Sequence, residues 1–313
     1  MEALMVSLNA VIPFVFYLAV GYGAKRLKMC SYDLLQGMNK LVFKAFFPLS
    51  LFWNMYTMDP SIEIDIPLLL AEGASLIALI ILLMLTVPWF VKENPRRGVV
   101  VQAIYRSNCV LFALPMAEVV MGEPGKIYAT MMLAVIVPIL NVSAVLVLES
   151  FHGEGLTDPK KLIINILTNP LIDGIAVGAL FFALGIHLPR FIETPVKNMG
   201  SMATPLALFI LGGTLEFSQV GKNLKCLTVA MGIKLLVIPL VVTVITTLAG
   251  LSDVVRFTFF IIYATPVATS SYVMAQNMGG DGELAGQFVV FSTVASALTL
   301  FIWVYAYAAL GFV

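Results

Sequence analysis

Long apolar stretches separated by short polar segments make up almost the whole chain. Each stretch has roughly 20 residues, the length that a helix needs to cross the hydrocarbon core of a bilayer. The pattern predicts an all-α integral membrane protein whose ten transmembrane helices lie at 5–24, 34–56, 66–91, 99–121, 126–148, 160–184, 198–216, 224–249, 255–277 and 284–311. The segment at 198–216 has the weakest pattern, because it begins with polar residues.

Composition supports a membrane location and argues against several functions. Of 313 residues, 60% are hydrophobic and 12% are charged, whereas soluble domains have about 45–50% and about 25%. The net charge of zero argues against a nucleic-acid partner. The three cysteines lie far apart, and we find no catalytic, nucleotide-binding or metal-binding motif. We therefore expect no enzymatic activity and no cofactor, apart from possible coupling to H⁺ or Na⁺.

Basic residues in the short loops indicate how the chain is oriented. If the N-terminus lies outside, the inner loops carry ten of them: Lys25, Arg26, Lys28, Lys92, Arg96, Arg97, Lys160, Lys161, Lys222 and Lys225. The outer loops then carry three: Lys126, Arg190 and Lys197. This asymmetry predicts a multi-pass protein with both termini on the outer side.

An internal repeat relates the two halves of the chain. At an offset of 157 residues, Pro13 aligns with Pro170, Ala19–Gly21 with Ala176–Gly178, and Pro48–Phe52 with Pro205–Phe209. At an offset of 151, Pro88 aligns with Pro239, Ala113 with Ala264, Pro115 with Pro266, and Ala117 with Ala268. We predict five-helix repeats at 1–152 and 153–313. Because five is odd, the second repeat is inverted, an arrangement typical of secondary transporters.

Two of these prolines, Pro115 and Pro266, lie near the middle of predicted helices four and nine. Proline interrupts a helix, and interrupted backbone inside a membrane is tolerated where it is buried or lines an aqueous cavity. The amide groups freed at such breaks favour a bound anion. An alternative interpretation is that the prolines only kink the helices and that nearby hydroxyl groups satisfy the local backbone.

Polar residues around the two prolines are the candidates for substrate binding. They are Ser107, Asn108, Pro115, Thr265, Pro266, Thr269, Ser270 and Ser271. Asn108 either contacts substrate or joins two helices, because an unpartnered amide is costly in hydrocarbon. Arg106 either offsets the charge of the substrate or extends to the inner interface.

Three further ionisable residues lie inside predicted helices, and such residues are candidates for coupling or gating. Glu118 is a candidate for binding a proton or a sodium ion, although it lies about one turn from the outer surface. Asp173 and Lys234 both lie toward the cytoplasmic side. An alternative for these two is that they form a structural ion pair.

Several motifs resemble the auxin efflux carrier (AEC) family of membrane transport proteins. They are Asn39–Phe43 followed by Pro48-Leu49, Ser107-Asn108 followed by Pro115, Asn169–Leu171, Pro205–Leu208 with Gly212, and Thr265–Ala268 followed by Tyr272–Ala275. The chain length is similar to that of the bacterial members, which implies the cytoplasmic (inner) membrane. The sequence differs from the pattern of the plant carriers at Ser271, where those carriers have a second proline.

The resemblance implies the fold of bile acid:sodium symporters. Helices at 5–56 and 160–216 would form a scaffold that is often homodimeric. Helices at 66–148 and 224–311 would form a mobile transport domain, in which broken helices four and nine cross at Pro115 and Pro266. It further implies elevator-type alternating access, with substrate carboxylates held beside the crossover. Bacterial relatives are assigned to malonate, malate or similar dicarboxylates and plant relatives to indole-3-acetate, and the sequence does not choose between them.

The leading hypothesis is a secondary transporter for a small organic anion, with the lipid bilayer as its environment. One alternative is a sodium-coupled bile-acid-type symporter, which sodium-dependent uptake abolished by Glu118→Gln would favour. A second alternative is a membrane sensor that keeps the fold and binds its ligand without moving it. Measurement of flux separates the sensor from the two carriers.

Overall fold

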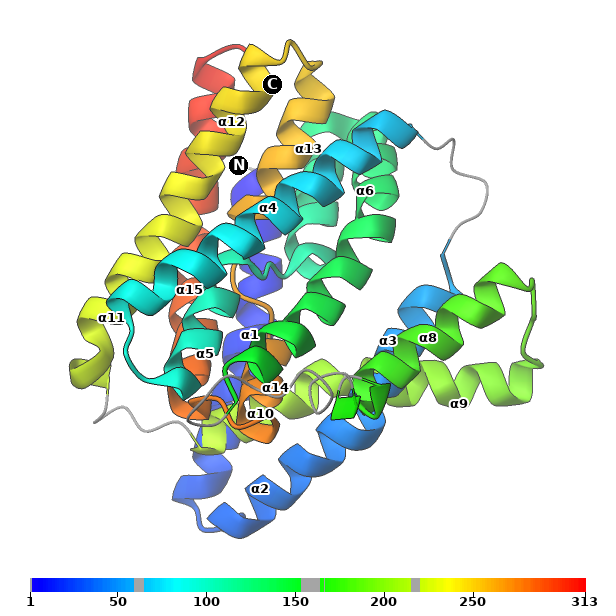
Figure 1. Ribbon diagram of the computed structural model, residues 1–313, viewed down its shortest axis with the longest axis vertical. Coiled ribbons are helices and arrows are strands. Elements are labelled where there is room, and N and C mark those ends of the chain that lie inside the picture. The colour runs from blue at the N-terminus through cyan, green and yellow to red at the C-terminus, as the bar shows by residue number, and fades with distance from the viewer. Residues whose placement is uncertain (1, 59–64, 153–163, 166, 215–219) are drawn as a thin grey trace.

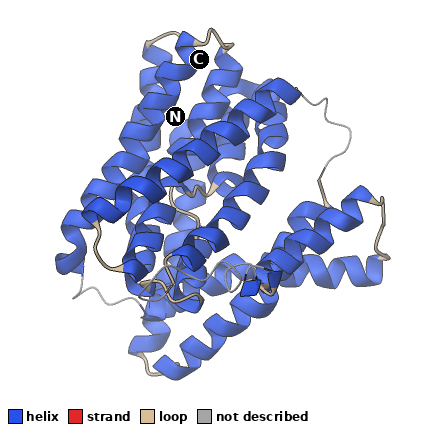
Figure 2. Ribbon diagram, viewed as in Figure 1, coloured by secondary structure: helices blue, strands red, loops and turns tan. Residues whose placement is uncertain are grey.

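The computed structural model describes residues 2–58, 65–152, 164–165, 167–214 and 220–313 (Figure 1). These parts of the chain are helices joined by loops, with no strand among them (Figure 2). The helices are α1 (Glu2–Arg26), α2 (Tyr32–Leu41), η1 (Val42–Phe46), α3 (Phe47–Tyr56), α4 (Ile66–Phe90), α5 (Asn94–Tyr105), η2 (Cys109–Ala113), α6 (Leu114–Ser150), α8 (Pro170–Ala183), α9 (Arg190–Ser201), α10 (Ala203–Thr214), α11 (Val220–Gly232), η4 (Ile233–Val237), α12 (Ile238–Leu248), α13 (Asp253–Ala264), α14 (Ser270–Asn277) and α15 (Gly282–Ala309).

Four helical stretches in the described residues are long and apolar enough to cross a bilayer. They are Ile66–Phe90, Cys109–Ser150, Gly221–Leu248 and Gly282–Ala309. Large apolar side chains on these helices face outward; Leu85 of α4 and Leu298 of α15, for example, are 64% and 63% exposed. Because such surface is stable only in hydrocarbon, the chain is a multi-pass membrane protein.

Polar residues at the loop ends fix where several helices begin. Asp65 precedes α4 and accepts a hydrogen bond from the backbone N of Leu68 at 3.1 Å. Asp281 precedes α15 and accepts one from the backbone N of Leu284 at 2.9 Å. Each carboxylate satisfies an amide that the helix itself leaves free and also lies at the positive end of the helix dipole.

In the described part of the chain, three short π-helical turns precede prolines inside longer helices. They are η1 before Pro48, η2 before Pro115 and η4 before Pro239. A proline lacks the amide hydrogen and its ring clashes with the carbonyl four residues earlier. The wider π turn accommodates this clash, so that the helix continues through the proline instead of ending there.

The structure corrects the predicted position of the break in helix four. The predicted break is at Pro115, but Pro115 lies in the first turn of α6, just after η2. The helix is instead interrupted at 106–108, between α5 and η2. The interruption in helix nine does include Pro266, as predicted, and extends over 265–269.

Other boundaries follow the sequence more closely. The helix predicted at 198–216 starts earlier, because α9 begins at Arg190, and it is interrupted at Met202 between α9 and α10. The predicted gap between 99–121 and 126–148 lies inside α6, where Gly122 has a φ of 68° and the chain changes direction. Glycine adopts this left-handed conformation without the steric penalty of a side chain.

Two close helix contacts are made at glycines. Both contacts join the same two positions of the sequence repeat, with the roles of the two halves of the chain exchanged. In one contact, α1 packs against α10, and a Cβ at Gly21 would overlap the carbonyl of Phe209. In the other, α8 packs against α3, and a Cβ at Gly178 would overlap the carbonyl of Phe52. Gly21 and Gly178 are related by the offset of 157, as are Phe52 and Phe209. Reciprocal contacts of this kind are what a two-fold relation between two halves produces.

Candidate functional site

The two interrupted segments cross near the middle of the molecule and pair through their backbones. The backbone N of Asn108 donates to the carbonyl of Pro266 at 2.8 Å, and Ser107 forms an isolated antiparallel bridge with Val267. The backbone N of Val267 donates to Ser292 Oγ of α15 at 3.0 Å. These bonds satisfy polar groups that unwinding exposes, which stabilises non-helical backbone at this depth.

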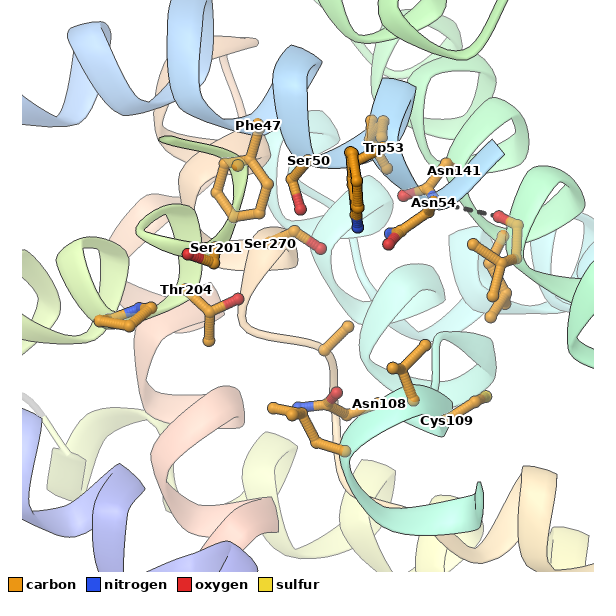
Figure 3. Close-up of a pocket in the computed structure, with 18 of the residues that line it drawn as sticks. Phe47, Ser50, Trp53, Asn54, Asn108, Cys109, Asn141, Ser201, Thr204 and Ser270 are labelled. Atoms are coloured by element: carbon orange, nitrogen blue, oxygen red, sulfur yellow. Dashed lines mark hydrogen bonds between the residues drawn. The ribbon is translucent and has the colours of Figure 1, made fainter. Parts of the chain in front are cut away.

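A cavity of about 790 Å³ lies between this crossover and four neighbouring helices. Its floor includes Arg106–Cys109, Ala268 and Ser270, and α6 adds Pro115 and Asn141. The opposite wall comes from α1, α3, α9 and α10. Figure 3 shows Asn108 on one side of the cavity and Ser50, Trp53 and Asn54 of α3 on the other. The volume is within the range of small-molecule sites, about 300–1,000 Å³.

Five of the residues singled out from the sequence line the cavity: Arg106, Ser107, Asn108, Pro115 and Ser270. The other four candidates at the second break, Thr265, Pro266, Thr269 and Ser271, are not among its lining residues. Their side chains point into the protein interior; Thr265 donates to the carbonyl of Ile262 at 3.3 Å. The hydroxyls of Thr269 and Ser271 have no hydrogen-bond partner in the described part of the chain.

Arg106 is an interior residue, and this rejects the alternative that it extends to the membrane interface. Its side chain is only 2% exposed. One guanidinium nitrogen donates to Asn141 Oδ1 at 2.7 Å, and the other lies 3.4 Å from Gln102 Oε1 and 2.7 Å from Met274 Sδ. These partners are neutral, so the positive charge is held at the cavity without a counter-ion among them.

Lys234 lies directly behind the floor of the cavity. It comes from η4, is 1% exposed and donates from Nζ to Ser107 Oγ. The alternative that Lys234 pairs with Asp173 is not realised here, because Asp173 is an exposed residue of α8. Lys234 instead connects η4 to the crossover through Ser107.

Glu118 is a surface residue in this structure. Its carboxylate pairs with Lys126 Nζ at 2.9 Å, and the two side chains are 45% and 43% exposed. It is not among the residues that line the cavity. An exposed ion pair of this kind contributes little energy, and the geometry gives no support to a coupling role for Glu118.

Sequence reasoning missed the wall that faces the crossover and one buried acid. The wall contributes the polar residues Ser50, Asn54, Lys197, Ser201 and Thr204, and α6 contributes Asn141. The buried acid is Glu72 of α4. The available signal was a polar residue inside an apolar helix, which Asn141 and Glu72 both provide. No sequence signal shows that Lys197 lies over Trp53, with Nζ 5.8 Å from the ring centroid.

A comparison with known families shows which class of membrane protein this is. The family described as membrane transport protein matches residues 6–155 and 157–304, so the chain belongs to this family, the auxin efflux carriers. No curated protein matches the chain.

Proposed function

We propose that this protein is a secondary transporter that carries a small organic anion across the cytoplasmic membrane. The cargo is a mono- or dicarboxylate such as malonate, malate or an auxin-like acid. The observation that carries the proposal is the cavity at the crossover, because its charge and its position both fit such a cargo.

The charge of the cavity favours an anion. Arg106 and Lys197 line it, while none of its described lining residues is Asp or Glu. The amine of Lys234 lies behind Ser107 and donates to its hydroxyl. The first residues of η2 and α14, Cys109 and Ser270, also face the cavity, so two helix N-termini direct partial positive charge toward it. A carboxylate held beside Asn108 would interact favourably with all of these groups.

The position of the cavity fits alternating access between two bodies. The proposed scaffold, 5–56 and 160–216, supplies one wall, and the proposed transport domain, 66–148 and 224–311, supplies the crossover. Exposed lining residues such as Asn54 and Lys197 mark the open side. At the other end the two bodies are in contact, with Thr214 Oγ1 2.9 Å from Tyr272 OH and Gln276 Nε2 3.4 Å from Gln36 Oε1.

A cavity open at one end and closed at the other is expected of one end state of a carrier. The distribution of Lys and Arg predicts that the open side is the outer side. The reciprocal contacts of α1 with α10 and of α3 with α8 support the two inverted halves, and such halves are the usual basis for exchanging inward-open and outward-open states.

Uptake into proteoliposomes tests the proposal. We expect labelled malonate, malate or indole-3-acetate to accumulate by exchange in vesicles loaded with the same unlabelled acid, and we expect uncharged amide analogues not to compete. Binding of an acid without flux would support the sensor alternative. Flux that requires sodium would support the bile-acid-type symporter. Absence of both binding and flux for all three acids would contradict the proposal.

A further inference from the structure

Glu72 is the most deeply buried carboxylate in the described part of the chain. It lies in the second turn of α4 and is 0% exposed. Neither of its carboxylate oxygens has a hydrogen-bond partner among the described residues. An ionised carboxylate held in this way costs several kcal/mol relative to water. A protonated carboxyl group avoids most of that cost, so the surroundings of Glu72 favour the bound proton.

The groups around Glu72 connect it to the cavity. Residues of α13 lie between α4 and η2, because the thiol of Cys109 lies 3.8 Å from the carbonyl of Ile262, next to Tyr263. The Tyr263 hydroxyl lies 2.7 Å from Ser75 Oγ, one turn along α4. Cys109 itself lines the cavity next to Asn108. These contacts connect the helix that carries Glu72 to a residue of the cavity floor.

The other helices packed against α4 bring no acid or base to Glu72. On α6, Val135 and Ile139 contact the position next to it, Gly73. Arg97 of α5 donates to the carbonyl of Val91, at the end of α4 far from Glu72. Tyr263 and Cys109 are the titratable groups that the contacts of the described residues place between α4 and the cavity.

The charges near the crossover are unbalanced when Glu72 is protonated. Arg106 is a buried cation, and its hydrogen-bond partners are neutral. A negative charge nearby is therefore favourable, and either a bound carboxylate or an ionised Glu72 supplies it. Two like charges this close disfavour each other, so a bound anion strengthens proton binding at Glu72, and by linkage a bound proton strengthens anion binding.

We propose that Glu72 is a proton-binding site coupled to the anion site across Cys109, so that the carrier binds one proton together with each anion. The inference rests on the function proposed above and names its coupling ion. A proton from the open side occupies a Glu72 oxygen before the anion binds, and both leave on the other side. The proton and a monovalent anion together add no net charge to the moving body, which reduces the cost of carrying it through the bilayer.

Infrared spectroscopy of the full-length protein in lipid tests the proton site without any ligand. We expect a protonated-carboxyl C=O band at neutral pH in the wild type that disappears in Glu72→Gln. The matched control is Glu118→Gln, which removes an exposed carboxylate on α6 and should leave the band unchanged. A wild type without the band, or a band that persists in Glu72→Gln, would overturn the proposal. Thermal unfolding of each variant shows whether it is folded.

Anion binding tests the coupling, with malonate, malate and indole-3-acetate as probes. In the wild type and in Glu118→Gln, apparent affinity should fall by up to about tenfold per pH unit as pH rises through the titration of Glu72. In folded Glu72→Gln the affinity should not change with pH, and exchange should continue. Equal pH dependence in all three proteins would overturn the coupling. If none of the probes binds, the proposed function and the coupling both fail, while the infrared band still decides whether Glu72 holds a proton.

Discussion

The two interrupted segments of the crossover contribute to the cavity in different ways. The first, Arg106–Asn108, is short and places polar side chains on the cavity floor. The second, 265–269, is longer and contains Pro266, and it contributes Ala268 and then the start of α14. The hydroxyls of Thr265 and Thr269 are buried away from the cavity. The first segment thus supplies side-chain recognition, and the second supplies backbone support and a helix N-terminus.

The largest expected effect comes from removing the buried cation of the first segment. In Arg106→Met the anion site loses a charge that neutral partners hold in place. We expect the affinity for the acid that is transported to fall a hundredfold or more, because breaking a buried charge interaction costs about 3–5 kcal/mol. Isothermal titration in detergent measures this. Arg97→Met, in α5 just before the interrupted segment, is the control, and equal losses in both variants would remove Arg106 from the site.

A smaller effect is expected from polar side chains, and here the two segments should differ. Asn108→Ala removes an amide on the cavity floor, and we expect about a tenfold loss of affinity, since an unpaired buried polar group costs about 1–3 kcal/mol. Thr269→Ala removes a hydroxyl that faces the interior, and we expect the affinity to remain nearly unchanged. The same titration measures both variants. If Thr269→Ala had the larger effect, the division of roles between the segments would be reversed.

The smallest expected difference concerns the prolines. Pro266 lies within the interrupted segment, so Pro266→Ala removes the residue that disfavours rewinding of helix nine. We expect exchange in proteoliposomes to slow by several-fold. Pro115 lies after a π turn that already accommodates it, so Pro115→Ala should be close to wild type. Equal slowing by the two variants would mean that Pro115 also controls the crossover.

These contrasts show which features of the structure could be predicted from the sequence. The apolar stretches predicted the helices. The prolines in register predicted which positions of the two halves are equivalent, and the contacts of Gly21 and Gly178 join such positions. The break at 106–108 was missed, because it depends on hydrogen bonds to a segment far away along the chain. The prediction relied on Pro115 and therefore placed the break seven residues too late. The polar residues Arg106, Ser107 and Asn108 mark its true position.

The wall opposite the crossover was not predictable for a related reason. Ser50, Asn54 and Thr204 lie on apolar helices whose polar positions show no clear periodicity. Which of their faces meets the cavity is decided by the packing of α3 and α10 against other helices. The environment of Glu72 was not predictable either, because its carboxylate is buried, without a hydrogen-bond partner among the described residues, only in the assembled fold.

The most direct test of the account is whether the anion occupies the cavity. Ser201 is an exposed residue of the cavity wall, and Ser201→Cys can be introduced after the three native cysteines are replaced by alanine. The measurement is the rate at which a membrane-impermeant thiol reagent labels Cys at this position, with and without saturating transported acid. We predict that the acid slows labelling and that the added change Asn108→Ala removes this protection at the same concentration. Labelling that is unaffected by an acid known to bind would contradict the assignment of the cavity as the transport site.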